Sequence, residues 1–198
     1  KDLMKYSLLT TLNDANSPSI DETAIATPET NVDNYGTYAL ALNNDSIRLS
    51  SVTLGSSDFT FEIIFYPIIL DNTRYLFDFR YGSGNGAATS NDGPNFAFYI
   101  TEEMPFIIIP DNTASASNIK SGIGIEANIG NEISNQRIIE ITNLKIKISW
   151  NHIVITRCDS INKVYLNGRL LLSFRENTNH SETEVLLGRN ATSVSDYF

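Results

Sequence analysis

Hydrophobic and polar residues alternate with a period of two along most of the chain, and no stretch keeps a helical period over three turns. Successive side chains of a strand point to opposite faces, so this alternation predicts β-strands. In residues 59–66 the odd-numbered positions are apolar, whereas the even-numbered positions are mixed. Residues 74–81 alternate likewise, with Tyr75, Phe77, Phe79 and Tyr81 on the predicted apolar face and Leu76, Asp78 and Arg80 on the mixed face.

Short strands are predicted along the rest of the chain, separated by clusters of glycine, asparagine and serine. Asn167-Gly168 joins two of them and is typical of a type I′ hairpin turn, which needs positive φ at both central residues. Residues 81–94 and 111–121 read as loops. The further predicted strands are 3–9, 38–42, 46–49, 95–101, 106–109, 123–127, 137–142, 144–149, 150–157, 161–166, 169–174 and 184–187.

This succession of short strands predicts an all-β fold, in which two antiparallel sheets bury their apolar sides against each other. The chain has 198 residues, shows no internal repeat and no domain boundary, and is long enough for one such domain without disulfides or metals. We therefore expect a single domain over 1–198, with residues 1–34 forming an N-terminal strand and loop.

Composition narrows the range of partners. The formal net charge is −9, and no run of Lys or Arg offsets it locally, so we expect neither nucleic acid nor an anionic membrane as a partner. No apolar run approaches the ~20 residues of a membrane helix, so insertion is not expected. Cys158 is the single cysteine, which excludes an intrachain disulfide. The chain begins at Lys1 rather than Met, and we expect a processed product or a part of a longer protein.

Three segments together resemble the laminin G-like branch of the concanavalin A-like lectin/glucanase superfamily. They are SDFTFEIIFYP (57–67), WNHIVITR (150–157) and KVYLNGRL (163–170), and the likeness extends over about 38–188. The resemblance implies a jelly-roll sandwich with Trp150 filling the core and His152 in the scaffold. Members of this superfamily usually have a closing strand after the segment that corresponds to Leu186-Leu187-Gly188, and we expect that strand to be removed, supplied by another chain or replaced by the first segment.

Catalysis is not expected. Glucanases of this superfamily carry a Glu-x-Asp-x-(x)-Glu strand that supplies two carboxylates ~5–5.5 Å apart, and no Glu-x-Asp occurs in this chain. Glu102 and Glu103 would point to opposite faces of a strand. A nucleophile needs a neighbouring base, and the two histidines, His152 and His180, lie in a scaffold strand and in a polar loop.

Calcium is a possible cofactor, because it takes carboxylate, amide and backbone oxygens from loops and related domains often bind it. The candidate ligands are Asp71, Asn72, Asn85 and Asp92. The alternative is that these Asp- and Asn-rich clusters are ordinary turns.

A sugar site needs aromatic faces and planar polar groups in a shallow groove. We expect these groups on the mixed faces of neighbouring strands, at Tyr66, Asp78, Arg80 and Tyr99, with Glu62 beside them. The alternative is an Asp78–Arg80 surface ion pair next to partly exposed tyrosines.

The function expected from these observations is a lectin-like binding or adhesion module, extracellular or on a virion surface such as a phage appendage. Its partners would be a glycan or a surface protein, and other subunits of a larger assembly. The alternative is a structural sandwich that decorates or cements a virion through protein contacts alone. A second alternative, a glycoside hydrolase, is disfavoured by the missing carboxylate motif.

Overall fold

The computed structural model describes residues 42, 46–50, 54–79, 96–110, 118–133, 136–176, 179, 184–190 and 198. The predicted strand 3–9 and nearly all of 38–42 lie outside these residues, as do Arg80, Asn85, Asp92 and His180. The described residues contain strands and no α-helix. None of them therefore forms a helix that could cross a membrane.

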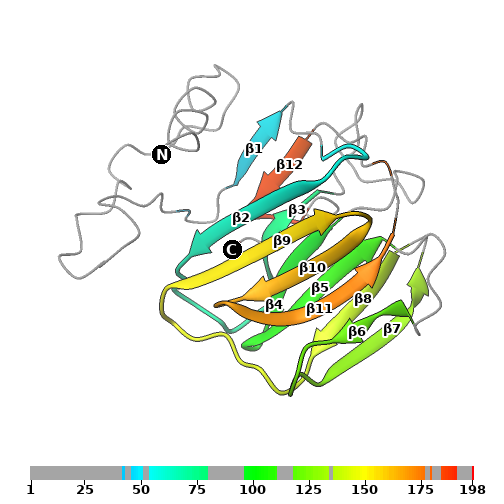
Figure 1. The fold of residues 1–198 in the computed structure, drawn as a ribbon. Helices are drawn as coiled ribbons and strands as arrows, with labels where there is room; N and C mark the ends of the chain where they lie inside the picture. The colour runs from blue at the N-terminus through cyan, green and yellow to red at the C-terminus, as the bar shows by residue number, and fades with distance from the viewer. Residues whose placement is uncertain are drawn as a thin grey trace.

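Two antiparallel sheets pack face to face, with the five-stranded sheet in front of the seven-stranded one in Figure 1. This arrangement confirms the predicted all-β jelly-roll sandwich. The seven-stranded sheet has the order β1 (Ile47–Ser50), β12 (Glu184–Leu187), β3 (Arg74–Asp78), β4 (Ala97–Thr101), β5 (Met104–Pro110), β8 (Gln136–Ile141) and β7 (Ala127–Ile133). The five-stranded sheet has the order β2 (Phe59–Phe65), β9 (Asn151–Cys158), β10 (Ile161–Leu166), β11 (Arg169–Arg175) and β6 (Lys120–Ser121).

The core lies between the sheets and is made by the apolar sides of alternating strands. Phe61 of β2 packs edge-to-face against Phe77 (ring centroids 4.9 Å apart) and Phe79 (4.7 Å) of the opposite sheet. In β9 the residues alternate strictly, so that Ile153 and Ile155 are fully buried while their neighbours reach the surface. The two-residue period seen in the sequence is therefore the period of burial.

A β-bulge in β3 overturns one predicted face. Tyr75 pairs with Tyr99, but the next pair joins Phe77 to Phe98, so Leu76 is an extra residue and packs into the core. Tyr75 therefore lies on the outer face of the sheet, opposite to Phe77 and not beside it as the alternation predicted. There it stacks on Tyr99 with ring centroids 4.7 Å apart, and Tyr99 stacks on Phe106 at 4.8 Å.

In the described part of the chain, three two-residue turns have positive φ at both central residues, as a type I′ hairpin requires. The predicted turn at Asn167 (51°) and Gly168 (76°) is confirmed. Asp159-Ser160 and Glu102-Glu103 adopt the same conformation, although neither pair contains glycine. Tight antiparallel pairing of the flanking strands holds these residues in a region of φ that side chains disfavour.

Two predicted strands are wrong. Residues 144–149 form no strand, since their backbone does not pair with a neighbouring strand. Instead, Ile146 N donates to Glu103 O in the β4–β5 turn (2.7 Å). Residues 123–127 begin with a turn at Ile123-Gly124, where Gly124 has a φ of 66°. The strands actually formed, β6 and β7, lie on either side of that turn.

The last described strand, β12, is not an edge, since β1 and β3 pair with it on its two sides. Phe198 lies next to this strand: its backbone N–H donates to Gly188 O (2.8 Å), and its ring packs on Phe65 with the centroids 5.6 Å apart. The backbone of β12 is thus covered on both sides by described residues of the same chain.

Candidate ligand-binding face

The predicted sugar site is not one site, because its residues lie on opposite sides of the sandwich. Glu62 and Tyr66 belong to β2 and the residue after it, in the five-stranded sheet, whereas Asp78 and Tyr99 belong to the seven-stranded sheet. β2 and β3 follow each other in the sequence, but the connection between them crosses from one sheet to the other. The prediction that these strands are neighbours is therefore wrong. Asp78 is also fully buried.

The outward side chains of the five-stranded sheet form a continuous surface, which we call the β2–β6 face. Strand register assigns its members, because outward residues pair with outward residues across the sheet. They are Thr60, Glu62, Ile64, His152, Val154, Thr156, Cys158, Ile161, Lys163, Tyr165, Leu170, Ser173, Arg175 and Lys120.

Glu62 and His152 are in direct side-chain contact on this face. Glu62 Oε1 lies 2.6 Å from His152 Nε2, and the side chains are 46% and 29% exposed. Glu62 pairs in register with Val154 and His152 with Ile64, so the two are diagonal neighbours on the outward side. His152 was assigned to the scaffold from the sequence, and the structure shows its side chain partly exposed on the outward side of the sheet.

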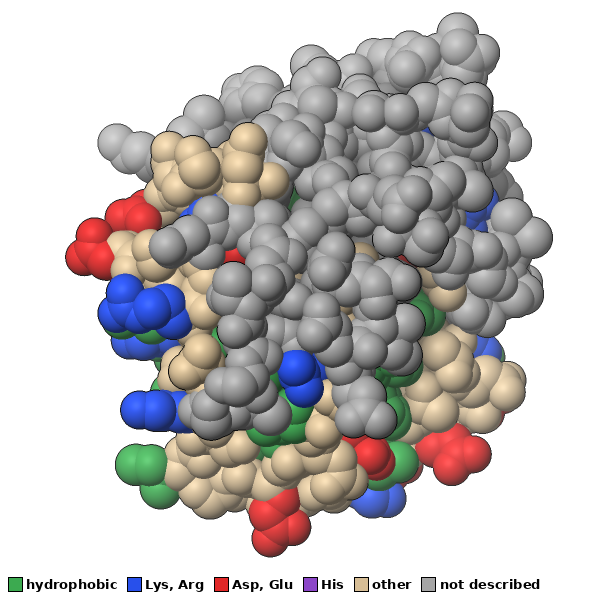
Figure 2. All heavy atoms as spheres, turned by 90° about the vertical axis from the view of Figure 1, so that its right-hand side faces the viewer, with side chains coloured by type: hydrophobic (Ala, Val, Ile, Leu, Met, Phe, Trp, Pro, Cys, Tyr) green, Lys and Arg blue, Asp and Glu red, His purple; other side chains and the backbone are tan. Residues whose placement is uncertain are grey.

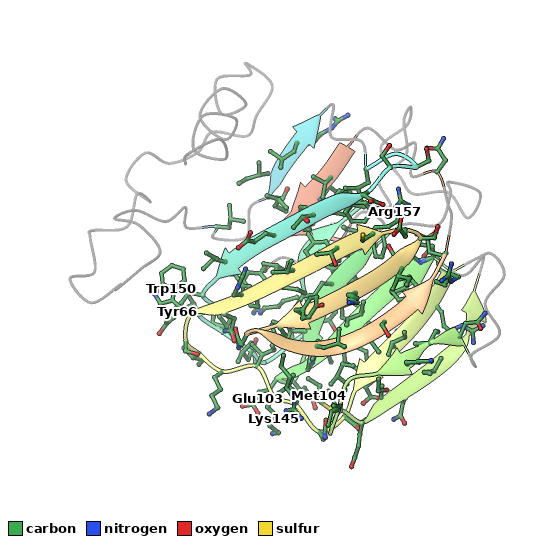
Figure 3. All side chains as sticks on the ribbon, viewed as in Figure 1. Tyr66, Glu103, Met104, Lys145, Trp150 and Arg157 are labelled. Carbon is green, nitrogen blue, oxygen red and sulfur yellow. The ribbon has the colours of Figure 1, made fainter. Side chains whose placement is uncertain are left out.

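Tyr66 and Trp150 meet at one end of the face, just beyond the register pair Phe65–Asn151 (Figure 3). Their rings are edge-to-face with centroids 5.6 Å apart, and Tyr66 is 42% exposed. Trp150 is half-buried and belongs to neither hydrophobic cluster of the interior. The prediction that Trp150 fills the core is wrong, because the first inward-facing residue of β9 is Asn151 and Trp150 precedes it.

A hydrogen-bond network fixes the backbone that carries Trp150. Asn167 Nδ2 donates to Asn151 Oδ1 (3.0 Å), and Asn151 Nδ2 donates to Ser149 O (2.7 Å) and Lys147 O (3.1 Å). Asn151 is 3% exposed, so these bonds are shielded from water. The segment leading into Trp150 is therefore held in place by a side chain from the hairpin turn on a neighbouring strand.

The calcium candidates are only partly within the described residues. Asp71 Oδ1 accepts a hydrogen bond from Arg74 Nη2 at 2.9 Å, and that bond lowers the pKa of the Asp71 carboxyl. A guanidinium at this distance competes with a cation for the same oxygen. No group of three or more His, Cys, Asp or Glu suited to a metal occurs among the described residues. Calcium binding by Asp71, Asn72, Asn85 and Asp92 stays a prediction.

The remaining carboxylates singled out from the sequence form a turn, not a strand pair. Glu102 and Glu103 are the central residues of the β4–β5 turn. Glu103 is engaged with Lys145, whose Nζ lies 2.7 Å from Glu103 Oε2 (Figure 3). The two glutamates thus serve a turn and a surface ion pair.

Comparisons with known proteins concern the fold. No protein-family model matches the chain, and no curated protein gives a significant match. Among solved structures, sheep galectin-11 in complex with glycerol matches at a TM-score of 0.45 and 13% identity, over 74% of this chain and 90% of that one. Domains LG4-5 of the mouse laminin α1 chain match at 0.43 and 8% identity, over 77% of this chain and 36% of that one.

At TM-scores below 0.5 the likeness extends to general architecture only. The ligand therefore has to be argued from the residues of this chain.

Sequence reasoning identified Glu62 and Tyr66 of this face but missed Trp150, His152 and Tyr165. The signal was present for His152, since it alternates with the apolar Ile153 and Ile155 in a strand whose inward side is unambiguous. No comparable signal marks Trp150, because the register of β2 against β9 decides its place beside Tyr66.

Proposed function

We propose that the protein is a non-catalytic glycan-binding module and that the β2–β6 face is its binding surface. The observation that carries this proposal is the pairing of two aromatic rings, Tyr66 and Trp150, at the same end of the face as the contact between Glu62 and His152. The expected setting is extracellular or the surface of a virion, and this setting is part of the proposal.

The chemistry suits a sugar. Aromatic rings offer flat apolar surfaces for the C–H faces of a pyranose, and their polar edges stay hydrated. A carboxylate and an imidazole accept and donate hydrogen bonds to hydroxyl groups, and bonds to charged groups are the stronger kind. A few oriented polar groups beside an apolar surface are the usual composition of a small-ligand site.

Preorganisation supports the same conclusion. Trp150 is attached to a backbone segment held by the buried Asn151 side chain, and Glu62 and His152 lie on paired strands β2 and β9. A ligand would therefore meet groups that are already positioned, which reduces the conformational entropy lost on binding.

A glycan array followed by calorimetry tests the proposal. Trp150→Ala, Tyr66→Ala and Glu62→Gln should each weaken binding to the glycan selected on the array by roughly 10-fold or more, as expected for hydrogen bonds to charged groups and buried aromatic contacts. Glu140→Gln is the matched control. Glu140 is a partly exposed carboxylate of β8 in the seven-stranded sheet, and it accepts a hydrogen bond from Asn128 of the neighbouring strand β7.

Tyr99→Ala separates this face from the one predicted by sequence. If Tyr99→Ala abolished binding while Tyr66→Ala left it intact, the outer face of the seven-stranded sheet would be the site. If no glycan bound the wild-type protein, the proposed function would fail.

One observation favours a second candidate, a structural module that binds another protein. Isoleucines 68, 69 and 148 are 70%, 50% and 57% exposed, and they lie within two or three residues of Tyr66 or Trp150 in the sequence. Exposed apolar groups gathered at one end of a domain are typical of protein contacts. Loss of assembly with a shell or fibre protein in Ile68→Ser, with glycan binding unchanged, would support this candidate.

A further inference from the structure

Three cationic side chains converge on the β2–β6 face, although they are far apart in the sequence. Ser173 of β11 pairs in register with Lys163 of β10 on one side and with Lys120 of β6 on the other. Arg175 is the next outward residue of β11. Since diagonal neighbours in a sheet lie ~7–8 Å apart and alternate strands ~9.5 Å apart, Ser173 stands at the centre of a cationic cluster formed by Lys120, Lys163 and Arg175.

The cationic cluster is not neutralised by neighbours in the described part of the chain. Lys120, Lys163 and Arg175 are all exposed, and none of them forms an ion pair with a described residue. The one described carboxylate within the strands of this face is Glu62, which is paired with His152. Asp58 and Asp159 lie at the turn end of the face, where Asp159 N donates to Asp58 Oδ1 (3.1 Å).

This concentration of positive charge is unusual for a protein of net charge −9. Like charges placed on neighbouring strands repel one another, so the cluster contributes nothing favourable to folding by itself. Figure 2, viewed from the side of β6 and β7, shows Lys and Arg side chains on its left-hand margin, with Asp and Glu side chains above them. The three cations belong to β6, β10 and β11, so no run of Lys or Arg in the sequence marks the cluster.

We propose that the ligand of the β2–β6 face is an acidic polysaccharide, whose sulfate, carboxylate or phosphate groups bind the cationic cluster while its sugar rings reach Tyr66 and Trp150. This inference rests on the proposed function and specifies its ligand class. Thr60 of β2 is level with Lys163, since both pair in register with Thr156. Tyr66 lies six residues further along the chain from Thr60, so the aromatic end and the cationic end of the face are roughly 20 Å apart. A monosaccharide cannot span that length, whereas a chain can.

The charge of the rest of the molecule favours a polysaccharide over nucleic acid. A nucleic acid carries a phosphate at every nucleotide, and these phosphates would meet the acidic surface beyond the three cations. A polysaccharide with spaced acidic groups needs only a local match. Ser173 adds a hydroxyl donor at the centre of the cluster, suited to an anionic oxygen.

Surface plasmon resonance with defined probes tests the inference. The probes are dextran sulfate, unmodified dextran of the same length and a single-stranded oligothymidylate, each at several salt concentrations. The variants are Lys120→Thr, Lys163→Thr and Arg175→Thr, singly and together, because threonine suits a strand and removes the cationic group. Lys145→Thr is the matched control: it also removes one charge, but in the segment between β8 and β9, where Lys145 contacts Glu103.

The wild-type protein should bind dextran sulfate more tightly than dextran, with affinity falling as salt rises. The triple variant should lose at least ~10-fold in affinity, and Lys145→Thr should lose little. Equal binding of dextran sulfate by the triple variant would overturn the inference, and so would equally tight binding of the oligothymidylate. If Trp150→Ala abolished glycan binding while the triple variant did not weaken it, the inference would fail and the proposed function would stand.

Discussion

Asn167 and His152 exchange two hydrogen bonds: His152 N donates to Asn167 Oδ1 (2.8 Å), and Asn167 N donates to His152 O (2.7 Å). One residue of the β10–β11 turn thereby completes the β9 ladder and, through Asn151, holds the segment that ends in Trp150. The same asparagine that makes a type I′ turn favourable also positions part of the candidate binding face.

Asn167→Gly should separate these two roles. Glycine tolerates the φ of 51° but lacks the side chain that accepts from His152 N and donates to Asn151 Oδ1. We therefore expect a loss of about 1–2 kcal/mol in the free energy of unfolding. Trp150 is the single tryptophan, so its fluorescence should also change as its segment loosens. Chemical denaturation and emission spectra measure both effects.

Gly168→Ala is the control for that variant. A Cβ at Gly168 meets nothing within 4 Å, so the cost is only the strain at a φ of 76°, about 1 kcal/mol. Unchanged tryptophan emission is expected. An identical spectral change in Asn167→Gly and Gly168→Ala would show that the turn conformation, and not the side-chain bonds, positions Trp150.

Arg157 anchors the end of the sandwich, and its loss should be costly. It is 3% exposed, donates through Nη2 to Gly55 O and Ser57 O (2.6 Å each), and lies 3.5 Å from a carboxylate oxygen of Glu176. Arg157→Ala removes the guanidinium beside a carboxylate that is itself buried, which typically costs about 3–5 kcal/mol. The midpoint of urea unfolding measures the loss.

The double variant Arg157→Met with Glu176→Gln tests the electrostatic part of this argument. Because it removes both charges, it should be less destabilised than Arg157→Ala. Equal destabilisation of the two proteins would assign the effect to the hydrogen bonds with Gly55 and Ser57 and to the contact with the Phe59 ring, 4.9 Å from the guanidinium carbon.

Gly122 should be intolerant of any side chain. An added Cβ would lie 1.8 Å from the carbonyl oxygen of Leu170, so backbone has to move to accommodate it. We expect Gly122→Ala to destabilise the fold by about 3 kcal/mol, at the upper end of the usual overpacking cost. Thermal unfolding followed by circular dichroism checks this. A change within ~0.5 kcal/mol, the usual range for neutral surface substitutions, would contradict the close approach of β6 to β11.

The Lys145–Glu103 contact should make stability depend on alkaline pH. The hydrogen bond to Glu103 raises the pKa of Lys145 above its ordinary value of 10.5. Because the pKa of Lys145 is raised in the folded state, its contact with Glu103 contributes fully to the free energy of unfolding below the unfolded-state pKa. That contribution is lost as pH rises through the folded-state pKa. The difference in melting temperature between wild type and Lys145→Met should therefore narrow above about pH 10.

Because both side chains are exposed, the effect should be small and weaken with salt. The backbone bond from Ile146 to Glu103 remains in the variant, so the turn itself should survive. A melting-temperature difference that stayed constant from neutral pH through pH 11 would contradict the ion pair.

The class of fold and many of its strands could be predicted from the alternation of apolar and polar residues alone. Period-two alternation in a strand such as 150–157 is imposed by the backbone geometry of that strand alone, and the Asn167-Gly168 turn follows from the φ that two adjacent residues can adopt. Such local causes are legible in a single sequence. The outward residues Glu62 and Tyr66 were identified in this way.

Which strands are neighbours and which residues share a face depends on the pairing of strands far apart in the sequence, and this pairing is seen only in the folded protein. β2 and β3 are consecutive in the sequence but lie in different sheets, so Asp78 and Tyr99 are separated from Tyr66 by the thickness of the sandwich. The bulge at Leu76 reversed the side of Tyr75, because one inserted residue inverts a two-residue period. Lys120 and Lys163 lie on either side of Ser173, because β6 and β10 both pair with β11. Strand alternation in the sequence does not reveal these non-local pairings, so the cationic cluster is visible only in the folded chain.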